Sequence, residues 1–420
     1  MKILVLDGNE NQAVACVRSL ARAGHRVSVG ASSSWSKAGW SRFAESSFTY
    51  PAPQDSAERF VARIQDEAAR EPGTLVIPVT ERTTLPLSAS REAILAAGGR
   101  LVLPPHETVM RAFDKTETTR LASSLGVAVP KTFYVTSVAE AREIASSISY
   151  PAVVKASSSE QLSASGKVLA TGAPLYARDA AELVAAIEQM SRRSSAALVQ
   201  EYVEGEGAGY FALMREGELR LEFAHRRIRD VRPTGSGSAV RESALADPRM
   251  RDAALRILEA LKWHGAAMVE FRVRPDGTPV FMEVNGRFWN SLPLSVHAGA
   301  DFPARLAEMA ERGDVLTAAD YRLGVRCRWL LGDARHLIEV WRGAPAGYAG
   351  KYPGRLRAML DFLTPVRGTY HDNFMMSDPL PELGDWLDFA LRRLPSQFKK
   401  RESVLESRGS VNVERRYSRS

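Results

Sequence analysis

Cysteine is nearly absent, and so is any long apolar run. Cys16 and Cys327 are the only two cysteines among 420 residues, too few for a disulfide framework or a zinc ligand set. This scarcity favours a reducing compartment, so we expect a cytoplasmic protein. The N-terminal apolar run, residues 2–6, ends at Asp7 and lacks a small-residue cleavage site. We therefore expect neither a signal peptide nor a membrane span.

A strong charge of one sign is also missing from most of the chain. The net charge is +7, but residues 398–420 hold seven Lys/Arg against three Glu. The remainder is only mildly basic and shows no interleaving of basic and aromatic residues, so we expect small anionic ligands and no nucleic acid. Hydrophobic residues at 45% and charged residues at 25% are typical of globular proteins. The length predicts two or three packed units, at ~100–200 residues per domain.

The N-terminal pattern is typical of a parallel α/β sheet. A buried strand at residues 2–6 precedes a helical pattern and a second strand at residues 27–29. We place this unit at residues 1–112. Its first turn lacks the G-x-G-x-x-G pattern, which argues against a nicotinamide-dependent oxidoreductase. Asn9, Glu10 and Gln12 could still reach a substrate from the carboxyl edge of the sheet.

The remaining chain predicts two α+β units and an appendage. A unit at residues 113–200 contains a strand ending at Lys155 and a Ser/Gly-rich stretch, residues 157–172, expected to be a mobile loop. The next unit, residues 201–320, contains alternating apolar strands that suit an antiparallel sheet. We expect a helical extension at residues 321–395 and a disordered basic tail at residues 396–420.

One predicted hairpin carries the most specific chemistry. Its two strands contain Glu270 and Glu283 and are joined by the turn at residues 275–277, so the two carboxylates can be cross-strand neighbours. Asn285 lies on the same face as Glu283 and completes an all-oxygen ligand set suited to Mg²⁺. Arg287, two residues further on, could contact phosphates bound to the same ion. The alternative is a solvent-facing hairpin with scattered charges.

Other polar residues occur at strand and helix ends. Lys115 begins a helix and Lys155 ends a buried strand, where each could contact a phosphate. The segment after residue 200 could present its backbone to an adenine base. A basic cluster, residues 225–227, and a glycine-rich segment with Arg241 could receive an anion, although a solvated basic edge explains them equally well.

Together these segments resemble the ATP-grasp superfamily, and within it the carboxylate-amine ligases similar to one half of the carbamoyl-phosphate synthase large subunit. The resemblance covers most of residues 1–310 in the same order. It is carried by five segments: Asp114-Lys115-Thr116, Val153-Val154-Lys155, Gln200-Glu201-Tyr202-Val203-Glu204-Gly205, Val269-Glu270-Phe271 and Met282-Glu283-Val284-Asn285-Gly286-Arg287.

The resemblance implies an ATP-grasp fold, in which a parallel α/β pre-ATP-grasp domain precedes two α+β subdomains that sandwich ATP, here with a C-terminal helical extension. It also implies roles for individual residues. Lys115 and Lys155 would bind phosphates, Glu201 and Val203 would meet adenine, and Glu206 would contact the ribose. The metal ligands would be Glu270, Glu283 and Asn285, and the catalytic cations would be Arg287, Arg226 and Arg241.

Two positions depart from the family pattern. Gly207 stands where many relatives have the ribose-binding acid, which is why that role moves to Glu206. Gly286 replaces a usual proline after the metal-binding asparagine, a change expected to loosen the turn.

The activity implied by the resemblance is an ADP-forming ligation of a carboxylate to an amine through an acyl phosphate. It would use ATP with Mg²⁺, which Mn²⁺ could replace. The sequence leaves the oligomeric state open, and a symmetric homodimer is the commonest soluble assembly. The alternative function is a catalytically silent ATP-binding regulatory or scaffolding protein, against which the complete set of Glu270, Glu283 and Asn285 argues.

Overall fold

The N-terminal unit is built on a four-stranded parallel sheet in the computed structural model, which describes residues 1–393 except 164–165, 319, 346–347, 349–350 and 365. The strand order is β3-β2-β1-β4. Its strands are β1 (Lys2–Val5), β2 (Arg26–Ala31), β3 (Ser46–Thr49) and β4 (Leu75–Ile77). Its helices are α1 (Asn11–Arg22), α2 (Ala57–Ala69), α3 (Glu81–Ala89), α4 (Arg91–Ala96) and α5 (His106–Phe113). Helix α5 runs across the predicted domain boundary at residue 112.

Residues 3–5 of strand β1 are apolar and buried, because helices cover both faces of the sheet. Ile3 and Val5 pack toward α1 and the large sheet, whereas Leu4 packs toward Phe60 of α2. Such burial on two sides produces a continuous apolar run rather than an alternating one. The prediction of a parallel α/β unit at the N-terminus is confirmed.

A small antiparallel lobe follows, with the strand order β5-β10-β6-β9. Its strands are β5 (Thr132–Val135), β6 (Ala152–Ala156), β9 (Leu175–Ala177) and β10 (Ala197–Glu201). Its helices are α7 (Val138–Ile144) with the 3-10 turn η1 (Ala145–Ser147), and α8 (Ala180–Ser191). Helix α6 (Lys115–Ser124) precedes the lobe in sequence and packs against α5, α9 and β15. The stretch expected to be only a loop contains a paired hairpin, β7 (Glu160–Leu162) and β8 (Val168–Ala170). Three-residue strands are too short for a period-2 pattern to reveal.

The largest sheet has seven strands in the order β15-β14-β11-β12-β13-β16-β17. Its strands are β11 (Glu206–Arg215), β12 (Glu218–Arg232), β13 (Ser236–Ser243), β14 (Gly265–Val273), β15 (Pro279–Asn285), β16 (Arg326–Arg328) and β17 (Tyr370–His371). Its neighbouring helices are α9 (Pro248–Ala260), α10 (Leu292–Ala298) and α11 (Phe302–Arg312). The glycine-rich segment, residues 234–238, is divided between a turn and a strand. Residues 234 and 235 lie in the turn before β13, whereas Ser236 and Ser238 belong to β13 and pair with Arg232 and Asp230 of β12.

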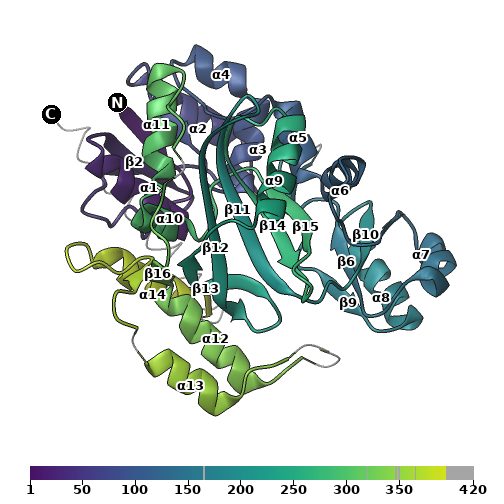
Figure 1. Cartoon of the computed structure of the whole chain (residues 1–420). Coiled ribbons are helices and arrows are strands. Elements are labelled where there is room, and N and C mark those ends of the chain that lie inside the picture. The colour runs from purple at the N-terminus through teal and green to yellow at the C-terminus, as the bar shows by residue number, and fades with distance from the viewer. Residues whose placement is uncertain (164–165, 319, 346–347, 349–350, 365, 394–420) are drawn as a thin grey trace.

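The C-terminal extension is helical as predicted, with α12 (Leu330–Arg342), α13 (Arg355–Leu363) and α14 (Leu380–Arg393). It also contributes β16 and β17 to the large sheet, which the sequence pattern did not predict. Figure 1 shows the small lobe at one side of the large sheet, the N-terminal unit at the other, and α12 and α13 below. The predicted tail, residues 396–420, lies outside the described residues. Within the described chain, no helix combines the length and apolar character needed to cross a membrane.

Candidate active site

A cavity of about 540 Å³ lies between the small lobe and the large sheet, and we call it the central cavity. Its small-lobe wall includes Lys155 and Val153 of β6 and the end of β10. The opposite wall comes from β12, β13, β14 and β15 and from the turn after β15. Ten of the predicted site residues line this cavity, two of them from the basic cluster at residues 225–227. They are Lys115, Lys155, Glu201, Val203, His225, Arg227, Glu270, Glu283, Asn285 and Arg287.

The two hairpin carboxylates are direct cross-strand partners. Glu270 of β14 pairs with Glu283 of β15, and Met268 pairs with Asn285. Nearer the turn Phe271 pairs with Phe281, and a register shift between Glu270 and Phe271 brings Glu270 opposite Glu283. The turn itself is tight: the Gly277 N–H donates to the Arg274 carbonyl over 2.8 Å, and Gly277 has a φ of +81°. Glycine adopts that left-handed conformation without strain. The predicted pairing of these carboxylates is confirmed.

Each carboxylate has its own cation. Arg227 Nη2 donates to Glu270 Oε1 over 2.9 Å, and Lys115 Nζ lies 3.1 Å from Glu283 Oε2. Burial alone would raise the pKa of Glu283, but Lys115 and Lys155 outweigh it and lower the pKa to about 2. The carboxylate of Glu283 is therefore ionised at neutral pH and available as a ligand.

The two lysines differ in their surroundings. Burial would lower the pKa of Lys115, but Glu283 and Glu81 raise it overall. Lys115 also donates to Ser159 Oγ over 2.9 Å, next to hairpin β7–β8. Burial dominates at Lys155 and lowers its pKa. Among the described residues the Lys155 side chain has no hydrogen bond or ion pair, so its ammonium group is free to meet an anion in the central cavity.

Arg287 connects the hairpin with the N-terminal unit. Its Nη2 donates to Asn285 Oδ1 over 2.8 Å and lies 3.7 Å from Glu81 at the start of α3. Burial raises the pKa of Glu81, although Arg287 opposes that shift. Sequence reasoning missed Glu81, since a glutamate in the first turn of a helix is ordinary dipole stabilisation.

Of the residues predicted to contact adenine and ribose, only some line the central cavity. Glu201 and Val203 line it, and Glu201 accepts a hydrogen bond from Arg274 over 2.8 Å. Glu206, expected to meet a ribose, is exposed at the start of β11 and does not belong to the lining. A Cβ on Gly207 would lie 2.6 Å from Arg227 Nη1. Gly207 thus leaves room for Arg227.

Two predicted catalytic arginines do not face the central cavity. Arg226 is exposed and pairs with Glu242, because strand alternation turns it away from the face shared by its neighbours. Arg241 is fully buried and binds Asp372 of the C-terminal extension over 2.5 Å. Arg227 instead occupies the cavity wall beside Glu270. Which arginine of the basic cluster faces the central cavity depends on the register of β12, and a run of adjacent basic residues does not reveal that register.

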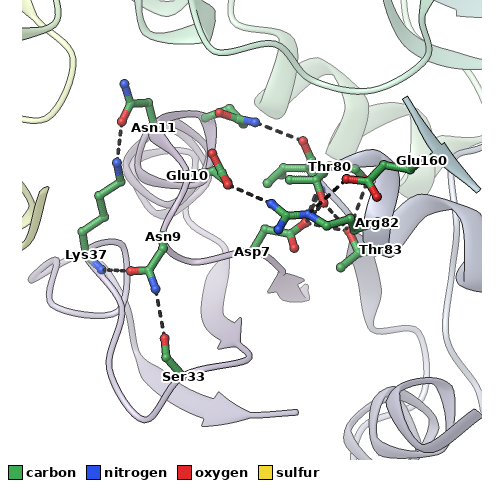
Figure 2. A network of polar contacts seen from close by, with 12 residues as sticks. Asp7, Asn9, Glu10, Asn11, Ser33, Lys37, Thr80, Arg82, Thr83 and Glu160 are labelled. Carbon is green, nitrogen blue, oxygen red and sulfur yellow. Dashed lines mark hydrogen bonds and ion pairs between the residues drawn. The ribbon is translucent and has the colours of Figure 1, made fainter. Parts of the chain in front are cut away.

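Polar residues of the first turn form hydrogen bonds within the N-terminal unit. Gln12 is buried and donates to the Val79 carbonyl over 3.1 Å, and Asn9 donates to Ser33 over 2.9 Å. Figure 2 shows Arg82 between Glu10 and Glu160, at 3.3 Å and 3.8 Å. Glu160 belongs to β7, so this arginine joins the N-terminal unit to hairpin β7–β8 beside the central cavity.

The oxygen donors of the hairpin fit a hard cation. Within the described residues no group of three or more His, Cys, Asp or Glu side chains is placed to hold a metal. The candidate set is therefore the carboxylates of Glu270 and Glu283 with the amide of Asn285, whose Nδ2 lies 3.3 Å from Glu283 Oε1. Two adjacent carboxylates with an amide oxygen suit Mg²⁺ shared with phosphate oxygens.

Comparisons with known proteins agree with this architecture. A family model described as an ATP-grasp domain matches residues 107–208. The N-terminal section of the carbamoyl phosphate synthase large chain from Methanopyrus kandleri is 29% identical over 214 residues, covering 48% of this chain and 36% of that relative. The chain thus spans about a third of that relative's length.

Solved structures share the fold at low identity. The biotin carboxylase domain of Hydrogenobacter thermophilus 2-oxoglutarate carboxylase, solved with MgADP and bicarbonate, aligns with a TM-score of 0.60 at 17% identity, over 77% of this chain and 73% of that one. The L-amino acid ligase of Bacillus licheniformis aligns with a TM-score of 0.57 at 17% identity, over 74% of each chain.

Proposed function

We propose that the chain is an ADP-forming ligase that joins a carboxylate to an amine through an acyl phosphate. The match of residues 107–208 to an ATP-grasp domain model supports this proposal. One observation carries the proposal. The paired carboxylates Glu270 and Glu283 face Lys115 and Lys155 across a single cavity, so metal ligands and phosphate-binding cations meet at one place. Such an arrangement serves phosphoryl transfer, which depends on positioning and charge neutralisation.

The residues divide the work between binding and catalysis. The adenine end is formed by Val153, Val203 and the end of β10, while Lys115 and Lys155 bind phosphate oxygens. Glu270, Glu283 and Asn285 would hold Mg²⁺, which when bound neutralises charge on the phosphoryl oxygens. Mn²⁺ offers the same preference for oxygen ligands.

Arg287 is placed for the first chemical step, in which a substrate carboxylate oxygen bonds to the γ-phosphorus and ADP leaves. Its guanidinium adjoins Asn285 and can stabilise the transferring phosphoryl group. In the second step an amine attacks the acyl carbon and inorganic phosphate departs. Arg227 replaces Arg226 and Arg241 as the cation nearest Glu270 that can stabilise the oxyanion of that step.

Hairpin β7–β8 is the proposed lid. The Lys115 N–H donates to the Ser157 carbonyl over 2.6 Å, and the Val168 N–H donates to the Pro53 carbonyl over 3.1 Å. Ser157 lies in the segment between β6 and the hairpin, so this segment contacts the start of α6, whereas the hairpin itself contacts the N-terminal unit. This position excludes water from an acyl phosphate, which would otherwise be hydrolysed.

The test is hydroxylamine trapping. Purified protein with Mg²⁺-ATP, hydroxylamine and pooled carboxylic acids should form a hydroxamate and release ADP, because hydroxylamine attacks an acyl phosphate. Glu283→Ala should give neither product, and Arg226→Ala, matched as a cavity-remote charge change, should behave as the unmodified protein. ATP binding without ADP release from any pool would favour the silent binding protein instead.

A further inference from the structure

A second cavity of about 580 Å³ lies against the C-terminal extension, and we call it the extension cavity. Its walls come from β12, β13 and β16, from α12 and α13, and from the segment that leads into β17. Arg326 and Arg328 of β16 and His371 of β17 belong to this lining. The volume lies within the range of ~300–1,000 Å³ typical of small-molecule sites.

An irregularity in β12 separates the two cavities. Residues two apart on a regular strand share a face, but the register of β12 against β13 shifts between Arg227 and Arg229. Arg227 consequently lines the central cavity and Arg229 lines the extension cavity. Asp230 lies in the wall between them, with its Oδ1 3.9 Å from Arg227 Nη1.

The extension cavity carries an excess of positive charge. Asp333 accepts hydrogen bonds from both Arg229 and Arg328, at 2.6 Å each. Asp361 lies 4.0 Å from Arg229 but also pairs with Arg357, so two carboxylates face three guanidinium groups and one positive charge stays uncompensated. Arg328 is directly paired across the sheet with His371.

The same imbalance recurs at a second carboxylate. Glu242 accepts hydrogen bonds from Arg326, which lines the extension cavity, and from Arg226 outside it. Lys351 adds an ammonium group to the lining, whereas Arg357 is balanced by Asp361 at 3.0 Å. The wall therefore has more cations than carboxylates to offset them.

Unpartnered polar atoms mark the end of the extension cavity near β17. Thr369 Oγ1 and His371 Nδ1 are buried without a hydrogen-bond partner among the described residues. Both residues line the extension cavity, two positions apart in sequence. A buried hydroxyl and imidazole nitrogen without partners cost free energy that a bound acceptor would recover.

We propose that the extension cavity binds a small oxyanion, a phosphate or carboxylate group of a metabolite, between the β16 arginines and the donors Thr369 and His371. Guanidinium groups match the planar or tetrahedral oxygens of such groups, and the hydroxyl and imidazole supply neutral donors. This site is distinct from the proposed ATP site and does not depend on it.

The experiment is calorimetric titration of full-length protein with two probes, inorganic pyrophosphate and citrate. A Lys115→Met/Lys155→Met variant removes the phosphate-binding cations of the central cavity and should still bind one probe saturably. Thr369→Val/His371→Phe keeps size and shape at the extension cavity while removing both donors. This variant should weaken probe binding at least tenfold. Circular dichroism and the thermal midpoint then check that the variant folds.

The two probes distinguish the ligand's source: tighter pyrophosphate binding indicates a phosphorylated metabolite, and tighter citrate binding a carboxylated one. The proposal is overturned if neither probe binds the Lys115→Met/Lys155→Met variant saturably. It is equally overturned if Thr369→Val/His371→Phe binds both probes as tightly as the unmodified protein.

Discussion

Replacement of Asp372 by alanine should destabilise the whole protein, because this carboxylate ends a buried network that joins the C-terminal extension to the rest. Asp372 and Arg241 are each only 1% exposed in their side chains. The carboxylate also accepts hydrogen bonds from Asn11 Nδ2 over 3.3 Å and from Cys327 Sγ over 3.1 Å. Removing one partner of a buried ion pair leaves an uncompensated charge, at a cost of ~3–5 kcal/mol in the free energy of unfolding.

Urea unfolding measures this cost. Asp372→Leu/Arg241→Met removes both charges and should recover most of the loss, with a coupling of ~2 kcal/mol or more between the sites. Glu339→Ala breaks the exposed pair with Arg342 and should change stability by less than ~1 kcal/mol. A loss at Asp372→Ala no larger than at Glu339→Ala would refute the reasoning. ADP release by the double variant also tests whether Arg241 is catalytic.

Two further predictions concern single buried positions. Burial raises the pKa of Glu382 from 4.5 to about 7, so its contribution to stability is present below about pH 4.5 and is lost as pH rises through about 7. In Glu382→Gln the unfolding free energy should therefore depend less on pH. Its change between pH 4 and pH 9 should shrink by up to ~3 kcal/mol, and an unchanged profile would contradict this. A Cβ on Gly286 would lie 2.3 Å from Trp263 Cη2, whereas one on Gly354 meets nothing within 4 Å. Gly286→Ala should lower the thermal midpoint and Gly354→Ala should not; equal midpoints would show that Trp263 shifts freely.

Much of the central cavity could be predicted from local pattern. A turn signal between two strands predicts the hairpin that carries Glu270 and Glu283, and the structure has that pairing. Their register also depends on an irregularity between Glu270 and Phe271, which the sequence pattern did not predict. Lys155 was recognisable as the end of a buried strand. The roles of these side chains toward ATP and metal stay predictions.

The remaining features depend on long-range packing. Arg227 faces the central cavity because of the β12 register, and Arg241 is buried because Asp372 comes from 131 residues away in sequence. Strands β16 and β17 are too short to show a period. Strand β16 forms because the edge of β13 supplies a partner, and β17 then pairs with β16. Gly286 was expected to loosen its turn, but it instead lets Trp263 and Phe113 pack closely.

The most direct test of the account is the Mg²⁺-dependent part of nucleotide affinity, measured by calorimetric titration with a non-hydrolysable ATP analogue in Mg²⁺ and in EDTA. The unmodified protein and Arg226→Ala should bind more tightly in Mg²⁺, because Glu270, Glu283 and Asn285 then share the ion with the phosphates. Glu283→Ala should lose that difference even though Lys115 and Lys155 remain. If Glu283→Ala keeps the full Mg²⁺-dependent gain, the central cavity is not the metal-nucleotide site.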